Sequence, residues 1–185
     1  NFQPLLLLKI LLCMFTARNA AMSFNRWADR RFDAQNPRTR KREIPAGVIS
    51  ARSALIFCIS QCVLFVLFAA WINPLCLYLS PIALIVILGY SLAKRFTSLC
   101  HFILGLGLAI APSGAYIAVS GKLDWLPICL SAMVLFWVGG FDILYALSDE
   151  EFDRNSKLHS IPAKLGRVHS MHLSQIVHAC AAALC

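Results

Sequence analysis

Residues 53–93 read SALIFCISQCVLFVLFAAWINPLCLYLSPIALIVILGYSLA and contain no Asp, Glu, Lys or Arg. A helix that crosses a bilayer needs about 20 mostly apolar residues, so this stretch is too long for one crossing. Asn73-Pro74 lies near its middle, and Asn-Pro is a turn signal. We therefore predict two membrane-spanning helices, at about residues 53–72 and 75–93.

The rest of the chain extends this pattern. Further apolar stretches lie at about residues 2–24, 99–120, 125–147 and 168–185. Hydrophobic residues make up 59% of the chain and charged residues only 14%, and the mean hydropathy is +0.69. Soluble domains carry about 25% charged residues. We predict an all-α fold, a polytopic transmembrane helical bundle, and exclude a soluble domain.

The basic residues are distributed unevenly along the chain, whose formal charge is +8. Fourteen Lys and Arg residues fall in three connections on one side of the predicted spans, at about residues 25–52, 94–95 and 148–167. The turns on the other side contain only Lys122. Cytoplasmic loops are enriched in Lys and Arg. We expect the basic side to face the cytoplasm in an inner-membrane protein, with anionic lipid rather than nucleic acid as the partner of this charge.

The two chain ends indicate a fragment. The sequence starts at Asn1 rather than Met and stops at Cys185 within an apolar stretch. We expect a single transmembrane domain, residues 1–185, that is truncated at both ends.

The first group of carboxylates follows the first predicted span. Asn25, Asp29 and Asp33 are spaced four residues apart, which places them on one face of an α-helix. The helix should end before Pro37, because the residue preceding a proline disfavours the α conformation. Glu43 follows in the same connection, and we interpret it as an interfacial charge.

A second acidic group ends the fifth predicted span. If the helix is continuous, Asp142, Asp149 and Asp153 fall within about 40° of one another. Asp142 lies in an otherwise apolar stretch, where a carboxylate costs about 2.5–3.5 kcal/mol and normally has a functional reason. Glu150 and Glu151 between them are interpreted as interfacial charges.

Two carboxylate rows on one membrane face suit a hard divalent cation. Mg²⁺ binds one or two carboxylates and completes its shell with water and phosphate oxygens, so the pattern suggests a diphosphate held through Mg²⁺. Arg38 and Arg42 follow the first row, and guanidinium groups suit phosphate oxygens. Tyr90 and Lys94, four residues apart at one helix end, can both donate to an anion, although a lysine there also anchors a span.

Together these residues resemble the UbiA superfamily of membrane prenyltransferases. The family's NxxxDxxxD motif appears as Asn25, Asp29 and Asp33, and its YxxxK motif as Tyr90 and Lys94. The sequence after the first row, N36-P-R-T39 and R42-E-I-P-A-G47, is similar to the family's continuation. The second aspartate motif appears as Asp142, Tyr145, Ala146, Asp149 and Asp153. Three motifs in order, each beside the corresponding span, make the resemblance specific.

The resemblance implies a nine-helix prenyltransferase fold and Mg²⁺-dependent transfer of a polyprenyl chain from its diphosphate to an aromatic acid. It implies metal ligands at Asp29, Asp33, Asp149 and Asp153, diphosphate contacts at Asn25, Arg38, Arg42, Tyr90 and Lys94, and catalytic roles for Asp142, Lys94 and Tyr90. The partners are then polyprenyl diphosphate, an aromatic acceptor and the bilayer.

The acceptor stays open at this point. The sequence L158-H-S-I-P-A163 is similar to the 4-hydroxybenzoate polyprenyltransferase-like branch, some members of which are tied to menaquinone made through futalosine. His159 departs from the commoner pattern of the aromatic-acceptor enzymes. The expected product therefore belongs to either ubiquinone or menaquinone biosynthesis.

Two other function classes share some of these features. CDP-alcohol phosphotransferases need an Asp-Gly pair that Asp33-Ala34 lacks. A transporter in which Asp142 relays cations is a non-catalytic alternative, but the basic NPRT-type connection argues against it. His101, His169, His172 and His178 do not predict a zinc site, and the eight cysteines, all in apolar stretches, do not predict a disulfide framework.

Overall fold

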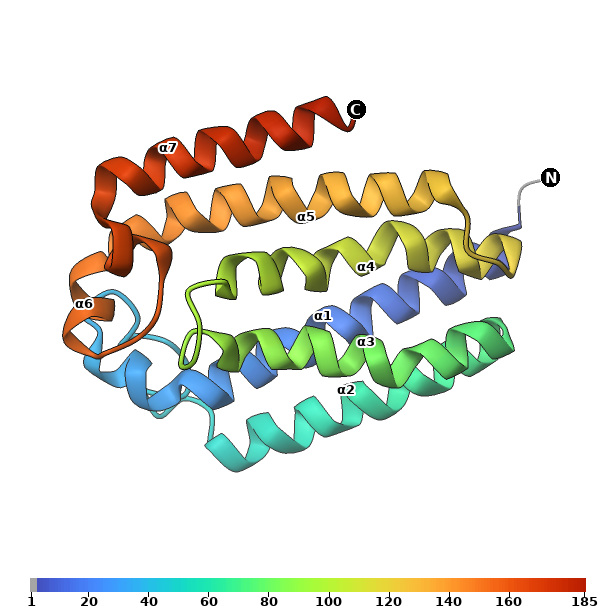
Figure 1. Ribbon diagram of the computed structural model, residues 1–185. Helices are drawn as coiled ribbons and strands as arrows, with labels where there is room; N and C mark the ends of the chain where they lie inside the picture. Colours follow the sequence, from blue (N-terminus) through green and yellow to red (C-terminus); the bar gives the residue numbers. More distant parts are fainter. Residues whose placement is uncertain (1–2) are drawn as a thin grey trace. The chain divides into compact units, whose positions relative to one another are not determined.

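The computed structural model describes residues 3–185, and all regular elements in this range are helical (Figure 1). The helices are α1 (Pro4–Gln35), α2 (Ala51–Ile72), α3 (Pro74–Ala93), α4 (Cys100–Ser120), α5 (Trp125–Ala146), the 3₁₀ turn η1 (Leu147–Asp149), α6 (Glu150–Asn155) and α7 (Ile161–Ala183). The predicted all-α class is confirmed. The chain forms two compact units, Asn1–Ser91 and Leu92–Cys185, which are described separately.

Five helical stretches among the described residues are long and apolar enough to cross a membrane, as judged from length and composition: α1 to α4 and the stretch Trp125–Asn155, which starts with α5. α7 is also long but less apolar, and it is not among the five. The first predicted span and the first acidic row turn out to share one uninterrupted helix, α1, of 32 residues. The row therefore keeps a fixed helical register with the span that precedes it.

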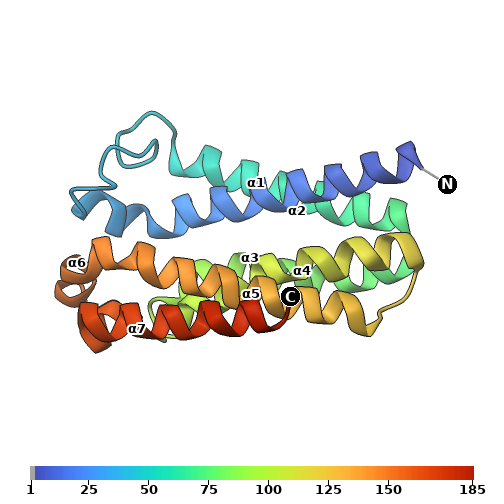
Figure 2. The ribbon, with the colours of Figure 1, turned by 90° about the horizontal axis from the view of Figure 1, so that it is seen from above.

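The first unit is built on close contact between α1 and α2, which run side by side (Figure 2). Ala20 is fully buried, and its carbonyl oxygen accepts a hydrogen bond from Cys58 Sγ at 3.5 Å. Small residues let helix backbones approach closely, which is the main source of helix association in lipid. α2 ends at Ile72 and is capped by Asn73, whose Oδ1 accepts a hydrogen bond from Cys76 N at 2.8 Å in the first turn of α3. This is the turn that Asn73-Pro74 predicted.

The unusual charge within the first span has a local partner. Lys9 Nζ donates to the carbonyl oxygen of Trp71 at 2.8 Å and lies 4.7 Å from the centroid of its ring. Trp71 is next to the last residue of α2, where carbonyl groups lack partners within the helix. Lys9 therefore donates to a free carbonyl group at the end of α2 and, among residues 3–185, does not pair with an acid.

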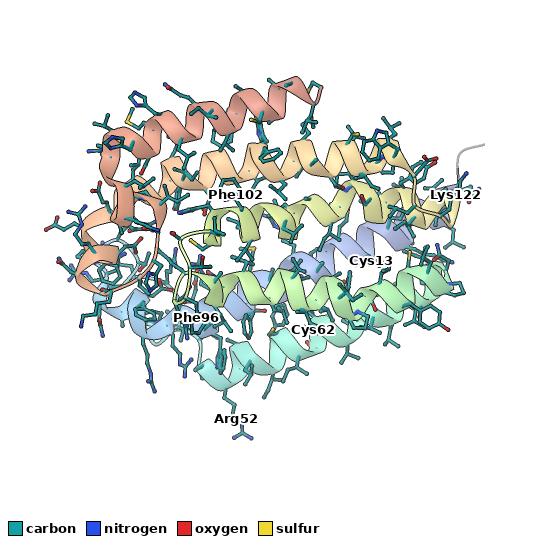
Figure 3. The ribbon with its side chains drawn as sticks, viewed as in Figure 1. Cys13, Arg52, Cys62, Phe96, Phe102 and Lys122 are labelled. Carbon is teal, nitrogen blue, oxygen red and sulfur yellow. The ribbon has the colours of Figure 1, made fainter. Side chains whose placement is uncertain are left out.

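The second unit depends on glycines at its helix contacts. α4 packs on α5 so closely that a Cβ on Gly105 would lie 2.5 Å from the carbonyl oxygen of Leu135. Phe102, labelled in Figure 3, lies against Gly139 of α5. A side chain at Gly105 would force the two helices apart, whereas one at Gly139 would meet the Phe102 ring at 3.2 Å and require that ring to shift slightly.

The helix that contains the second acidic group is not continuous. α5 ends at Ala146, η1 follows, and Asp149 has φ −110° and ψ 7°, outside the α-helical region. The shared face of Asp142, Asp149 and Asp153 was expected only for a continuous helix, and that condition is not met. The turn tightens after Ala146, so α6 starts with a new register. The chain then continues through residues 156–160 into α7, which is interrupted at Gly166 with φ 73°.

Candidate functional site

The first acidic row lies near the end of α1. Asn25 Nδ2 donates to Asp29 Oδ2 at 3.1 Å, one helical turn away. Asp33, one turn further, is buried. α1 ends two residues later, and Asn36 has extended backbone angles, so the helix stops before Pro37 as predicted.

Asp33 is held by the connection that follows α1. Arg42 Nη1 lies 2.8 Å and 3.0 Å from its two carboxylate oxygens, and Thr39 Oγ1 donates to its backbone carbonyl at 3.3 Å. Arg38 N donates to Asn36 Oδ1 at 2.9 Å, which turns the chain back toward the helix. The residue predicted to contact diphosphate, Arg42, therefore pairs with a residue predicted to bind metal.

Tyr90 and Lys94 lie at the end of α3, one helical turn apart. Tyr90 is half-buried within the first unit, whereas Lys94 follows the last residue of α3 and belongs to the second unit. The predicted joint action of this pair on an anion is not tested by the geometry of either unit.

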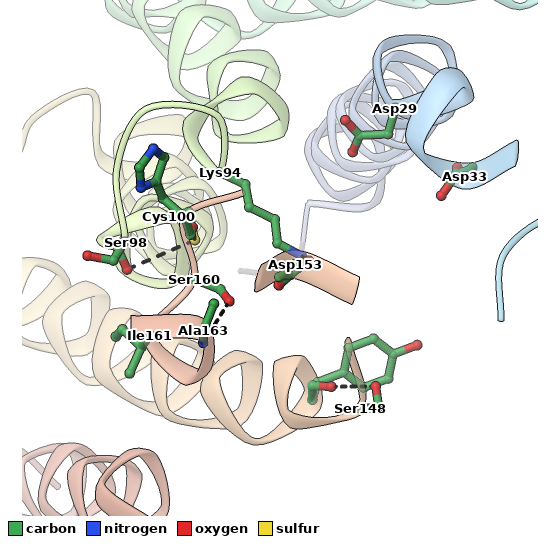
Figure 4. A network of polar contacts seen from close by, with 12 residues as sticks. Asp29, Asp33, Lys94, Ser98, Cys100, Ser148, Asp153, Ser160, Ile161 and Ala163 are labelled. Carbon is green, nitrogen blue, oxygen red and sulfur yellow. Dashed lines mark hydrogen bonds and ion pairs between the residues drawn. The ribbon is translucent and has the colours of Figure 1, made fainter. Parts of the chain in front are cut away.

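The second acidic row centres on Asp153, which is fully buried in α6. Lys94 Nζ lies 2.7 Å from Asp153 Oδ1, and Figure 4 shows the lysine reaching the carboxylate. Within residues 3–185, Asp153 Oδ2 has no hydrogen-bond partner. A buried carboxylate with one cation and one unsatisfied oxygen is costly. The burial of this oxygen is therefore uncompensated within the described residues.

Asp149 is also buried, in η1, four residues before Asp153. Because Asp149 lies in a 3₁₀ turn, its position around the helix axis differs from the position expected in a regular α-helix. The two carboxylates still belong to one short segment, as the sequence indicated.

Asp142 has a partner that the sequence analysis missed. His101, buried at the start of α4, has Nδ1 2.7 Å from Asp142 Oδ2. Its Nε2 accepts a hydrogen bond from Ile161 N at 3.2 Å. Because Nε2 is the acceptor, the proton of the neutral ring resides on Nδ1 and is donated to Asp142. The sequence does contain a signal for this pair, because His101 and Asp142 are polar residues in two apolar spans and both lie at the basic end of their span.

The same histidine belongs to a set of contacts that fix the chain before α7. Ile161 is the first residue of α7, and His159 N donates to the carbonyl oxygen of Lys94 at 2.7 Å. Cys100 Sγ donates to the carbonyl oxygen of His159 at 3.4 Å. The backbone around Lys94 is thereby tied to the segment that follows Asp153.

The aspartates of the two motifs are suited to bind Mg²⁺ two at a time, and they do not form a preformed metal cage. Among residues 3–185, no group of three or more His, Cys, Asp or Glu side chains is placed to hold a metal ion. Each unit instead has a buried carboxylate with a second one four residues before it, Asp29 before Asp33 and Asp149 before Asp153. Two carboxylates are what Mg²⁺ usually takes from protein when phosphate completes its shell. The unsatisfied oxygen of Asp153 is consistent with this use.

Comparisons with known proteins agree with the motifs. The model of the UbiA prenyltransferase family matches residues 1–185. Similar curated proteins include a 4-hydroxybenzoate octaprenyltransferase of Nitrosomonas europaea, 32% identical over 89% of this chain and 56% of that protein. One of Photobacterium profundum is 34% identical over 81% of this chain and 52% of that protein. The chain spans about half the length of these relatives.

Solved structures show the same fold. An apo structure of a UbiA homologue from Aeropyrum pernix superposes with a TM-score of 0.94 at 35% identity, covering 100% of this chain and 70% of that one. A UbiA homologue from Archaeoglobus fulgidus bound to DMAPP and Mg²⁺ gives a TM-score of 0.78 at 24% identity, covering 96% and 64%. With its three ordered motifs and a family match over its whole length, the chain belongs to the UbiA prenyltransferase family.

Proposed function

We propose that this protein transfers a polyprenyl chain from polyprenyl diphosphate to an aromatic acid such as 4-hydroxybenzoate, in a reaction that depends on Mg²⁺. The observation that carries the proposal is a pair of ion pairs, Asp33–Arg42 and Asp153–Lys94, in each of which the buried acid belongs to an aspartate motif of the family. Curated relatives are named 4-hydroxybenzoate octaprenyltransferase, which supports this acceptor class. The UbiA homologue bound to DMAPP and Mg²⁺ supports the donor class and the metal.

The acidic residues are assigned to metal binding. Asp29 and Asp33 in one unit, and Asp149 and Asp153 in the other, would hold Mg²⁺ for the diphosphate. Bound Mg²⁺ would neutralise charge on the diphosphate and make it a better leaving group. Asn25 orients Asp29 through the hydrogen bond between them.

The basic residues are assigned to the diphosphate. Arg42 and Lys94 each hold a carboxylate here, and both can transfer hydrogen bonds from that carboxylate to phosphate oxygens when the metal neutralises the acid. Arg38 and Tyr90 are assigned to the same anion. This exchange of partners explains why Arg42 and Lys94 contact carboxylates in a site that is proposed to bind diphosphate.

Departure of the diphosphate breaks the allylic C–O bond and leaves a carbocation, which the aromatic acceptor attacks before losing a proton. Asp142 is assigned a catalytic role, and its hydrogen bond from His101 keeps the carboxylate oriented. Exclusion of water protects the cation from hydrolysis. The localisation consistent with this chemistry is the inner membrane, with the basic connections and both acidic rows facing the cytoplasm.

The proposal is tested with the full-length protein in proteoliposomes. It is offered one prenyl diphosphate with 4-hydroxybenzoate and competing aromatic acids, and products are identified by mass spectrometry with and without Mg²⁺. We expect a prenylated aromatic acid only with Mg²⁺, and loss of product in an Asp29→Asn, Asp149→Asn double variant. Retained transfer by that variant contradicts the metal assignment, and transfer to none of the acids contradicts the acceptor class.

A further inference from the structure

A cavity of about 770 Å³ opens on the surface of the second unit, between the α3–α4 connection and the chain that links α6 to α7. Its lining includes Arg154, Lys157, Lys164 and His159, together with the apolar side chains of Phe96 and Leu158. No acidic side chain lines it. None of the residues assigned above to metal or diphosphate lines it either, so the proposed reaction gives this cavity no role.

The cavity has an excess of positive charge. Arg154 Nη2 donates to Glu150 Oε1 at 2.9 Å, so this cation is already paired. Lys157 and Lys164 are exposed, and in the described part of the chain neither takes part in an ion pair. Two ammonium groups therefore face the cavity without a counter-charge, which favours an anion as its occupant.

The backbone at Lys157 is a second, independent observation. Lys157 has φ 55° and is the single non-glycine residue with positive φ among residues 3–185. Leu158 N donates to the carbonyl oxygen of Asp153 at 2.9 Å, which closes α6 with the motif whose left-handed position is usually glycine. A lysine costs stability at this position, and the turn does not need its side chain. Its amine at the cavity gives a reason for the lysine.

The anion must be recognised by side chains. The first backbone N–H groups of α7, which also starts at this cavity, are already used, since Ile161 N donates to His101 and Ala163 N to Ser160 Oγ. The second residue of the helix is Pro162, which has no N–H. Binding therefore depends on Lys157 and Lys164, and a variant at one of them will report on it.

The surroundings favour a lipid. Phe96, labelled in Figure 3, is 78% exposed in the α3–α4 connection, where it helps to line the cavity. An exposed apolar ring beside amines offers a contact for acyl chains next to a contact for anionic headgroups. The connections that form the cavity are basic ones, predicted to meet the leaflet that is rich in anionic lipid. We propose that this cavity binds the phosphate headgroup of an anionic phospholipid.

The test is native mass spectrometry of the full-length protein, exchanged from detergent into equimolar phosphatidylglycerol and phosphatidylcholine with identical acyl chains. We expect phosphatidylglycerol to be retained preferentially, and Lys157→Gly to reduce its retention about fivefold. The same substitution should leave the melting midpoint unchanged or raise it by about 2–4 °C, because glycine removes the left-handed strain. Lys157→Arg should keep the lipid.

Arg52→Gln is the matched control, because Arg52 is an exposed cation on the same predicted membrane side but does not line the cavity. Equal lipid retention in Lys157→Gly and Arg52→Gln overturns the proposal. Displacement of phosphatidylglycerol by millimolar inorganic diphosphate, with diphosphate retained in its place, overturns the lipid assignment and makes the cavity a site for a soluble anion. Neither outcome depends on prenyl transfer, so the two proposals fail separately.

Discussion

Asp33 and Asp153 are both buried carboxylates at the basic ends of spanning helices, yet the chain holds them differently. Asp33 lies on an uninterrupted helix, and one arginine nitrogen contacts both of its oxygens. Asp153 lies on a short helix after a 3₁₀ turn, with one oxygen 2.7 Å from a lysine and the other without a partner in the described chain. The first carboxylate is satisfied within its own unit, and the second is left partly unsatisfied.

This difference indicates at which carboxylate a bound ligand would stabilise the protein more. A metal ion or a donor placed at Asp153 satisfies an oxygen that otherwise has a desolvation cost, whereas one placed at Asp33 must compete with Arg42. We therefore expect the stability of the protein to fall further when Lys94 is replaced than when Arg42 is replaced. We also expect Mg²⁺ to stabilise the second row more than the first.

The largest expected effect comes from removing Lys94. Lys94→Met leaves the fully buried Asp153 without a counter-charge, and we expect a loss of about 3 kcal/mol of stability. Arg42→Met should cost only about 1–2 kcal/mol, because the Asp33 side chain keeps 7% exposure to water. Unfolding midpoints of the purified protein in detergent measure both.

The control is the double variant Lys94→Met, Asp153→Asn. It removes the buried charge together with its partner and should recover most of the lost stability. The comparison fails if Arg42→Met is the more damaging single substitution, or if the double variant is no more stable than Lys94→Met alone.

A second prediction concerns His101, which makes a donor and an acceptor contact at the same time. His101→Leu leaves the Ile161 N–H without an acceptor and Asp142 without a donor, and should cost about 2 kcal/mol. His101→Gln has an amide that can both donate and accept, and should recover about half of this loss. Thermal unfolding compares the two variants with His178→Gln as a second histidine replacement.

Equal destabilisation by Leu and Gln at position 101 would mean that ring packing rather than hydrogen bonding is what the histidine provides. The result bears on the second row, because the contact between His101 and Ile161 helps to fix the chain that follows Asp153. No corresponding histidine supports the first row, whose connection is held by Asn36 and Thr39.

The two acidic rows also differ in how much of their structure could be predicted from the sequence. The first row was predictable because a spacing of four residues in a regular helix sets both position and face, and Pro37 sets the end. The second row was predictable only as a set of residues. The 3₁₀ turn after Ala146 and the pairing of Asp142 with His101, 41 positions away in sequence, depend on how α4, α5 and α7 pack, and no local pattern encodes that packing.

Lys9 gives a smaller contrast, because it is a cation within a span whose partner is not an acid. Lys9→Met removes a hydrogen bond to the Trp71 carbonyl and a contact with its ring, and should cost about 1 kcal/mol or less. Lys9→Arg should be close to neutral. A loss as large as that of Lys94→Met would mean that Lys9 faces a buried charge after all, and unfolding midpoints decide it.

The smallest expected effect is at Asp124, the N-cap of α5 in the turn that also contains Lys122. Asp124 is fully exposed and caps α5, accepting from Trp125 N at 2.7 Å and from the Tyr116 hydroxyl at 3.1 Å. These hydrogen bonds, the backbone one first, hold the pKa of Asp124 below its ordinary value of 3.8. A carboxyl whose pKa falls on folding adds stability above its unfolded pKa, and the gain is lost as pH falls through the folded value.

Asp124→Asn keeps an oxygen for the cap but cannot titrate, so it isolates the charge. We expect wild type to be slightly more stable than Asp124→Asn from pH 5 to 7, and the two unfolding midpoints to converge below pH 3.8. A gap that stays constant down to the lowest pH would show that the cap acts through geometry alone. Because Asp124 has water on all sides, this response sets the scale of an ordinary capping acid, against which the buried acids of the two rows can be judged.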